Sequence, residues 1–227
     1  WLAASTEVRA GWTALADAAS IVGSPATRGT GPIGGNLMNA SPAAETIAPF
    51  VVLDAEVTLR GPGGATRSLP AADLATGPGR TIATQGELLT RVTVPTAAAG
   101  SGSAYIRLEY RRAMEIAVVG AAALVSIADG VVRDARIALT AVAPTIVRAP
   151  EAEAVLRGAP STRSSFLDAG RAAAAAARPI DDVRASADYR RAMLEVVVAR
   201  VLAAAAARAT GGQVPIPASR WAHGQEI

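Results

Sequence analysis

The sequence contains no cysteine, no lysine and a single histidine, His223. Without cysteine the chain cannot form a disulfide, hold a thiolate zinc site or an iron–sulfur cluster, or use a catalytic thiol. His223 lies in a tail rich in proline, glycine and glutamine, where a solvated surface role is expected. We therefore predict no metal ligands in this chain, no catalytic residue of its own and no serine–histidine hydrolase chemistry.

Aromatic residues are also scarce, at 4% of the chain, and the arginines are spread among 19 acidic residues for a formal net charge of +3. This distribution offers no basic and aromatic platform for nucleic acid. No apolar run reaches the roughly 18 residues that a membrane span needs, and no charged-then-apolar leader opens the sequence. We therefore expect a cytoplasmic protein that does not bind nucleic acid.

Glycine, by contrast, is concentrated in residues 23–45, which contain five glycines at positions 23, 29, 31, 34 and 35. Such a stretch predicts a loop with positive φ angles whose main-chain N–H groups converge on a phosphate without help from lysine. An ordinary surface turn has the same composition. Neither the P-loop motif nor the Gly-x-Gly-x-x-Gly dinucleotide motif is present.

The first half of the chain alternates between helical and strand-like patterns. We expect a strand end at residues 2–6, helices at 12–22 and 43–53, hairpin strands at 56–60 and 66–69, a helical turn at 70–74 and a strand at 88–94. The run rich in alanine, glycine and serine at residues 96–103 resembles a linker. We therefore predict a first domain at residues 1–98.

The second half begins with strands and ends with helices. We expect strands at residues 104–110, 117–128 and 131–142, with a two-residue turn at Asp129-Gly130, and helices at 151–156, 165–177 and 188–209. The predicted fold class is therefore α+β: a mixed α/β unit, then a three-stranded antiparallel sheet with a helical bundle at residues 99–210, and a tail at 211–227.

Several runs resemble the flavin-binding medium subunit of the molybdenum hydroxylases, the family that includes xanthine dehydrogenase, aldehyde oxidoreductases and aerobic carbon monoxide dehydrogenase. They are Gly-Ser-Pro at residues 23–25 followed by Arg28, Ile-Gly-Gly-Asn at 33–36, Asn-Ala-Ser-Pro-Ala-Ala-Glu at 39–45, Arg-Arg-Ala-Met-Glu-Ile-Ala-Val-Val at 111–119, and Ala-Ser-Ala-Asp-Tyr-Arg-Arg at 185–191. The resemblance implies a PCMH-type FAD-binding domain whose N-terminal subdomain, with its own Gly-Gly loop, has no match here.

The resemblance also implies which residues meet the cofactor. The loop at residues 31–36 would hold the FAD pyrophosphate, Glu45 and Arg107 would contact the cofactor, and Glu115 and Ile116 would lie beside the isoalloxazine ring. The full set of expected FAD-binding residues is Gly31, Pro32, Ile33, Gly34, Gly35, Asn36, Glu45, Arg107, Glu115 and Ile116.

Each of these assignments has a plainer alternative. Glu45 is also favoured in the first turn of a helix by the helix dipole, Arg107 and Glu109 can simply pair at the surface, and Ile116 can be a core residue. The pair Arg111-Arg112 is expected to be a solvated or subunit-facing charge cluster.

One position departs from the resembled family. Pro32 stands where threonine is usual and supplies neither an amide nor a hydroxyl donor. Loss of one charge-assisted hydrogen bond costs about 1.5–3 kcal/mol, or roughly one to two decades in affinity.

The implied function is electron transfer by an oxidoreductase subunit. In the resembled family, electrons pass from a molybdopterin centre on a large subunit, through two [2Fe-2S] clusters on a small subunit, to FAD and then to an external acceptor. We therefore expect both subunits as partners, in a dimer of heterotrimers. Two alternatives stay open: a structural or assembly subunit of the same complex with weak or lost FAD binding, and an unrelated nucleotide-binding module.

Overall fold

The computed structural model describes residues 1–111 and 113–222, so the expectations for Arg112 and His223 lie outside the described residues. The first half of the chain contains five α-helices: α1 (Thr6–Gly11), α2 (Thr13–Ile21), α3 (Pro25–Thr30), α4 (Ile33–Met38) and α5 (Ile47–Val52). They pack beside an antiparallel sheet with the strand order β2-β1-β5, formed by β1 (Glu56–Arg60), β2 (Thr66–Pro70) and β5 (Leu88–Thr93). Short elements complete this half: η1 (Pro62–Gly64), η2 (Ala71–Asp73), β3 (Ala75–Gly77) and β4 (Arg80–Thr81).

The second half is built on an antiparallel sheet with the order β6-β7-β8-β9, formed by β6 (Ser101–Leu108), β7 (Val119–Ala128), β8 (Val131–Thr140) and β9 (Val147–Arg148). In the described residues after this sheet, four helices follow: α6 (Pro150–Leu156), α7 (Arg163–Ala176), α8 (Ala187–Ala209) and α9 (Ser219–Ala222). Helix α8 packs on β6 and β7, and α7 packs on α8.

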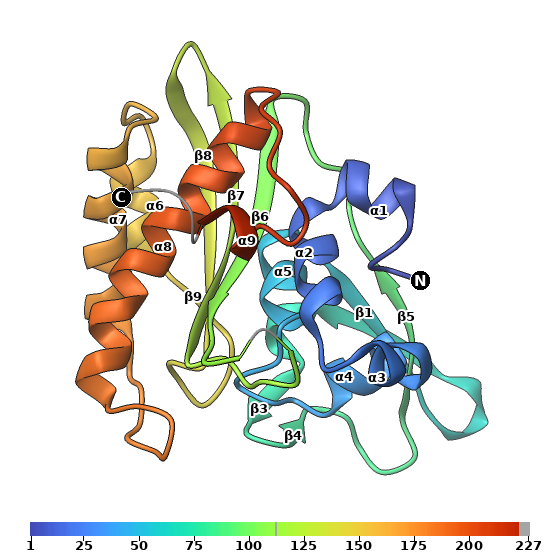
Figure 1. Cartoon of the computed structure of the whole chain (residues 1–227). Coiled ribbons are helices and arrows are strands. Elements are labelled where there is room, and N and C mark those ends of the chain that lie inside the picture. Colours follow the sequence, from blue (N-terminus) through green and yellow to red (C-terminus); the bar gives the residue numbers. More distant parts are fainter. Residues whose placement is uncertain (112, 223–227) are drawn as a thin grey trace.

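The four-stranded sheet is buried on both faces. Figure 1 shows it standing between helices α6–α8 on one side and the N-terminal helices on the other, and α2 and α5 contact its strands directly. Successive residues of β6 enter different cores: Ala104 and Ile106 face α8, while Tyr105 faces the N-terminal half. A strand buried on both faces lacks polar alternation, and the central strand β7 is accordingly almost continuously apolar in sequence. This sheet therefore joins the two halves of the chain.

Most expected elements are confirmed. Helices α2, α6, α7 and α8, the β1–β2 hairpin, the η2 turn and strands β5, β7 and β8 lie within a few residues of their predicted positions. Asp129 and Gly130 both have positive φ angles, 54° and 71°, as a two-residue hairpin turn requires. The mixed α+β fold class is therefore correct.

The predicted strand end at residues 2–6 is wrong, because α1 starts at Thr6 with the Ser5 hydroxyl accepting from the Val8 amide at 3.3 Å. The sheet of the second half has a fourth strand, β9, which is too short at two residues to leave a sequence pattern. The predicted linker is wrong at its end. Residues 101–103 belong to β6, and a Cβ on Gly102 would lie 2.3 Å from the Ala205 carbonyl oxygen of α8, so this glycine permits close packing.

The helix predicted at residues 43–53 is shorter than expected, since α5 spans only Ile47–Val52. Glu45 consequently precedes the helix rather than occupying its first turn. The domain boundaries 1–98, 99–210 and 211–227 stay predictions; in the structure, Ala218 from the last segment is fully buried in the core beneath α8. Within the described ranges, none of the helices is both long and apolar enough to cross a membrane.

Candidate flavin site

The predicted phosphate loop folds as two short helices. Helix α3 covers Pro25–Thr30, and α4 starts at Ile33 after the cap residue Pro32, whose φ and ψ are −75° and 147°. The expected positive φ angles are wrong for four of the five glycines, because only Gly23 has one, at 49°. Helix geometry nevertheless leaves the first-turn amides of α4 directed outward from its N-terminus, where they favour an anion.

The glycines of this stretch differ in what surrounds them. A Cβ on Gly31 would lie 2.9 Å from the Thr27 carbonyl oxygen, which is too close, and one on Gly35 would lie 3.3 Å from the Pro32 ring. A Cβ on Gly34 would make an ordinary 3.5 Å contact with Leu89. Among the glycines at positions 31, 34 and 35, the steric need for glycine within the protein itself is therefore strongest at Gly31 and absent at Gly34.

A cavity of ≈ 680 Å³ opens beside these helices. Its lining includes five of the predicted residues, namely Gly31, Pro32, Ile33, Gly35 and Asn36. Gly34 instead lines a neighbouring, more apolar groove. The Asn36 side-chain oxygen accepts from the Thr46 hydroxyl at 2.6 Å, which ties α4 to the residue that follows Glu45.

The other predicted residues meet at Arg107, near the end of β6. Its Nη1 donates to Oε1 of Glu45 and, at 3.1 Å, to the main-chain oxygen of Glu115, while its Nε donates to Glu109. The Arg107 side chain is 0% exposed, whereas the carboxylates keep 10–11% of their surface. The predicted pairing of Arg107 with Glu109 is therefore present, but its expected surface location is wrong.

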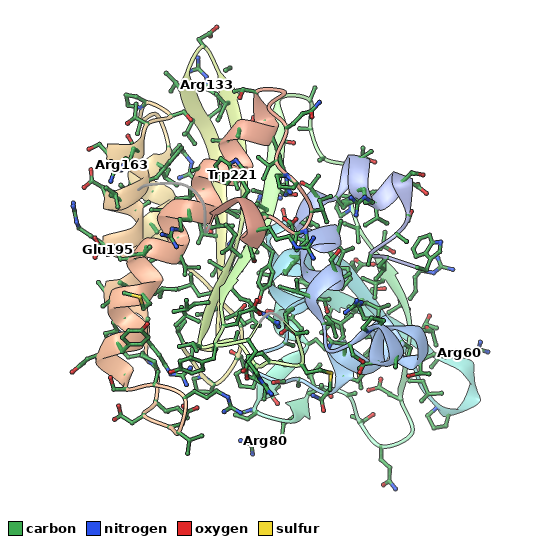
Figure 2. All side chains as sticks on the ribbon, in the orientation of Figure 1. Arg60, Arg80, Arg133, Arg163, Glu195 and Trp221 are labelled. Carbon is green, nitrogen blue, oxygen red and sulfur yellow. The ribbon has the colours of Figure 1, made fainter. Side chains whose placement is uncertain are left out.

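This burial sets Arg107 apart from most arginines of the chain. In Figure 2, Arg60, Arg80, Arg133 and Arg163 lie at the edge of the molecule, and all four are exposed. Such exposed charges contribute little to stability, whereas a buried charge must be paired.

The electrostatics of the cluster follow from its burial. Burial raises the pKa of Glu45 above its ordinary value, although the charge of Arg107 opposes that shift. Burial also raises the pKa of Tyr105, two residues before Arg107 on the same face of β6, so this phenol stays neutral. For Arg107, burial acts to lower the pKa, but Glu45 and Glu109 outweigh it and keep the guanidinium charged.

The cluster has a free donor. Among residues 1–111 and 113–222, Nη2 of Arg107 finds no hydrogen-bond acceptor, although it is buried. A buried donor without a partner costs about 1–3 kcal/mol, so such groups are rare unless a ligand or water completes them. The residues present therefore fit a cofactor that brings an acceptor, such as a ring carbonyl oxygen.

Glu115 and Ile116 lie on the loop between β6 and β7. The Glu115 carboxylate accepts from the Ile116 amide and from Nε of Arg111, both at 3.0 Å, and these two contacts lower its pKa. Ile116 is 46% exposed, so the alternative that it is a core residue is wrong. Only the main chain of Glu115 reaches Arg107.

The structure thus gathers most of the predicted residues into two groups, one lining the cavity and one around Arg107, while Gly34 lines the neighbouring groove. Sequence reasoning missed the Thr46 link between them and the buried Tyr105. It also missed Arg190, which is 3% exposed and donates from Nη1 to the main-chain oxygens of Val118 and Ala141 at the ends of β7 and β8. Arg190 is a charged residue on the apolar face of α8, and that position in the helical pattern is the signal that could have indicated it.

Comparison with known families divides the chain into two matched regions. Residues 2–97 match the FAD binding domain in molybdopterin dehydrogenase, and residues 104–205 match the carbon monoxide dehydrogenase flavoprotein C-terminal domain. The second match begins within β6, so Glu45 comes from the first region and Arg107 from the second.

Individual relatives agree with this division. The carbon monoxide dehydrogenase medium chain of Hydrogenophaga pseudoflava is 35% identical over 91% of this chain and 71% of its own length. The xanthine dehydrogenase FAD-binding subunit of Escherichia coli O157:H7 is 29% identical over 87% of this chain and 68% of its own.

Solved structures share the fold. The carbon monoxide dehydrogenase structure from H. pseudoflava superposes with a TM-score of 0.86 and 37% identity, covering 91% of this chain and 71% of that one. Quinoline 2-oxidoreductase from Pseudomonas putida 86 gives a TM-score of 0.85 at 29% identity, covering 92% and 72%. This chain therefore belongs to the family of FAD-binding medium subunits of the molybdenum hydroxylases.

Proposed function

We propose that this chain binds FAD between the α4 N-terminus and Arg107, and passes electrons from [2Fe-2S] clusters on a small subunit to an external acceptor. The observation that carries the proposal is the ion pair between Glu45 and the buried Arg107, whose Nη2 has no acceptor among the described residues. The pair joins the two family-matched regions where a cofactor would contact both.

When bound, FAD supplies the ability to accept two electrons and release them in one or two steps. The chain's own residues have simpler roles. The first-turn amides of α4 would hold the negatively charged pyrophosphate. Arg107 would donate from Nη2 to an acceptor on the flavin ring and stabilise negative charge there. The Glu115 and Ile116 loop would cover the ring and limit its contact with water.

The proposed partners follow from the relatives, one of which is named a medium chain and another a subunit of a dehydrogenase complex. We infer an assembly with an iron–sulfur small subunit and a molybdopterin large subunit, as a dimer of heterotrimers. Sedimentation of the native material tests this. A free monomer at micromolar concentration would count against it.

The flavin assignment is tested by glycine substitutions whose effects on the protein differ. Gly34→Val and Gly35→Val place side chains at the α4 N-terminus, whereas Gly11 lies outside the cavity and a Cβ there would meet no described heavy atom within 4 Å. We expect both α4 variants to lose flavin, measured by visible absorption of the purified protein, and Gly11→Val to keep it. Equal flavin in all three would contradict the site. A colourless wild-type protein that still assembles with its partners would favour a structural subunit.

A further inference from the structure

The protein assigns three of the five N–H donors of Arg107. A guanidinium has five N–H donors, one on Nε and two on each terminal nitrogen. Nε donates to Glu109, and Nη1 serves both Glu45 and the Glu115 main-chain oxygen. Nη2 is left without an acceptor in the described part of the chain. Nη2 is therefore the one nitrogen of Arg107 that lacks an acceptor among the described residues, while Glu109 holds Nε.

Glu109 is well placed to act on Arg107. Glu109 directly follows the last residue of β6, and its carboxylate accepts from Nε of Arg107. The strand end is fixed, because the Val118 amide donates to the Leu108 main-chain oxygen at 2.9 Å. The Glu109 side chain is 11% exposed and so has little freedom to rotate into solvent.

The bond at Nε controls the orientation of the whole guanidinium plane. The guanidinium rotates about its Cδ–Nε bond, so a hydrogen bond from Nε fixes the directions in which both terminal nitrogens point. Without it, Arg107 would be free to turn and grip Glu45 with two parallel hydrogen bonds, the geometry that guanidinium and carboxylate prefer. That arrangement would consume Nη2.

We propose that Glu109 is a positioning residue of the flavin site, which pairs with Nε of Arg107 and thereby keeps Nη2 available for an acceptor atom of the cofactor. This inference rests on the proposed function, because it assumes that flavin is the ligand. It adds Glu109 to the residues proposed at the flavin site.

Two variants separate positioning from charge. Glu109→Ala removes the acceptor, and Glu109→Gln keeps an amide oxygen at the same place but removes the charge. The matched control is Glu87→Ala, since Glu87 also pairs with one arginine, Arg67, but on the β1–β2 hairpin side of the molecule. All are made in the native protein with any subunits that accompany it, and thermal unfolding identifies any variant that is not folded.

The first measurement is flavin affinity, by fluorescence titration of protein stripped of cofactor. We expect Glu109→Ala to weaken binding by about ten- to a hundredfold, the usual effect of losing one hydrogen bond to a charged group. Glu109→Gln should stay within about threefold of wild type and Glu87→Ala within about twofold, each well below the tenfold that 1.4 kcal/mol represents.

The second measurement needs no flavin. In the nitrogen-resolved NMR spectrum, the Arg107 Nε–H proton should be downfield and protected from exchange in wild type and Glu109→Gln, and unprotected in Glu109→Ala. Unchanged flavin affinity in a folded Glu109→Ala protein would overturn the inference while leaving the proposed function intact. Wild-type protein that binds no flavin would overturn both.

Discussion

Asp17 of α2 and Arg208 of α8 form a two-pronged ion pair across 191 positions of sequence, with Nη1–Oδ2 and Nη2–Oδ1 distances of 2.7 and 3.0 Å. The same carboxylate accepts from the main-chain amides of Tyr105, at 3.0 Å, and Ala218, at 2.9 Å. The Asp17 side chain is 0% exposed. This single carboxylate therefore connects α2, β6, α8 and the segment before α9.

The first prediction concerns this ion pair. Arg208→Met leaves the Asp17 carboxylate buried without its counter-charge, which should lower the free energy of unfolding by about 3–5 kcal/mol. Arg171→Met is the control, because Arg171 is 61% exposed in its pairs with Asp168 and Glu195 and should contribute at most about 1 kcal/mol. Urea unfolding measures both. Similar losses of unfolding free energy in the two variants would show that the buried pair of Asp17 and Arg208 stabilises the fold no more than an exposed pair.

A second prediction concerns the pH dependence of Glu87. The hydrogen bond from Arg67, followed by that from the Thr84 amide, lowers the pKa of Glu87 to about 2. Because the folded-state pKa lies below the unfolded one, the stabilisation is complete above the ordinary value of about 4.5. This stabilisation is lost as the pH falls from about 4.5 through about 2. In Arg67→Met, the pKa of Glu87 should rise back toward 4.5, and a carbon-detected NMR titration measures this change. An unchanged value would contradict the role of Arg67.

A third prediction tests the close approach of α7 and α8. A Cβ on Gly170 would lie 2.4 Å from the Glu195 carbonyl oxygen, so Gly170→Ala must push the helices apart. Overpacking of this kind costs about 1–3 kcal/mol, which outweighs the gain of about 1 kcal/mol in helix propensity. Gly29→Ala, in open space within α3, should instead be neutral or stabilising. Thermal unfolding of the two variants should therefore shift in opposite directions or by clearly different amounts.

Pro32 gives a fourth prediction. Its backbone has the extended conformation of a helix cap, in which threonine can accept from an amide of the first turn of α4. Pro32→Ala restores one donor, the amide, and Pro32→Thr restores the amide and a hydroxyl. We expect flavin affinity to rise in the order proline, alanine, threonine, by up to roughly a decade for each donor gained.

The control for Pro32 is stability without flavin. Gain of a cap, about 1 kcal/mol, is offset by about 0.4–1 kcal/mol for the greater freedom of an unfolded chain without proline. Unfolding free energies should therefore change little, so a change in affinity reports on the cofactor. Equal affinities in all three proteins would mean that position 32 does not face the phosphate.

Local sequence patterns predicted the elements that are long or that end at a clear turn. Helix α8, at 23 residues, and the β7–β8 hairpin with its Asp129-Gly130 turn are examples. Local patterns failed where tertiary contacts decide. The glycines at 31 and 34–35 indicated a loop, yet the segment packs as helices against its neighbours, and the two-residue β9 forms only because β8 is available for pairing.

The candidate site shows the same division. Its residue identities were predictable because they lie in motifs that resemble a known family. Their geometry was not, because Arg107 and Glu45 lie 62 positions apart in the sequence, just as Asp17 and Arg208, outside the site, lie 191 positions apart. No local pattern specifies such pairs; only packing of α2, α5 and α8 on the β6–β7 sheet brings them together.

The last prediction concerns Arg107 itself. Met at this position would bury two carboxylates, Glu45 and Glu109, side by side without a cation, because Arg107 is the partner of both. We expect Arg107→Met to lower the free energy of unfolding by about 3–5 kcal/mol. The double variant Arg107→Met with Glu109→Gln should recover part of that loss, since one of the facing charges is gone.

Arg107→Lys completes the series. It keeps a charge but replaces the planar group with a point donor that cannot serve Glu45, Glu109 and a cofactor in fixed directions. We expect it to fold nearly as stably as wild type, by urea unfolding, while losing about tenfold or more in flavin affinity. A lysine variant that binds flavin as tightly as wild type would contradict this expectation. It would show that Arg107 contributes only its charge and not a hydrogen bond of fixed direction from Nη2.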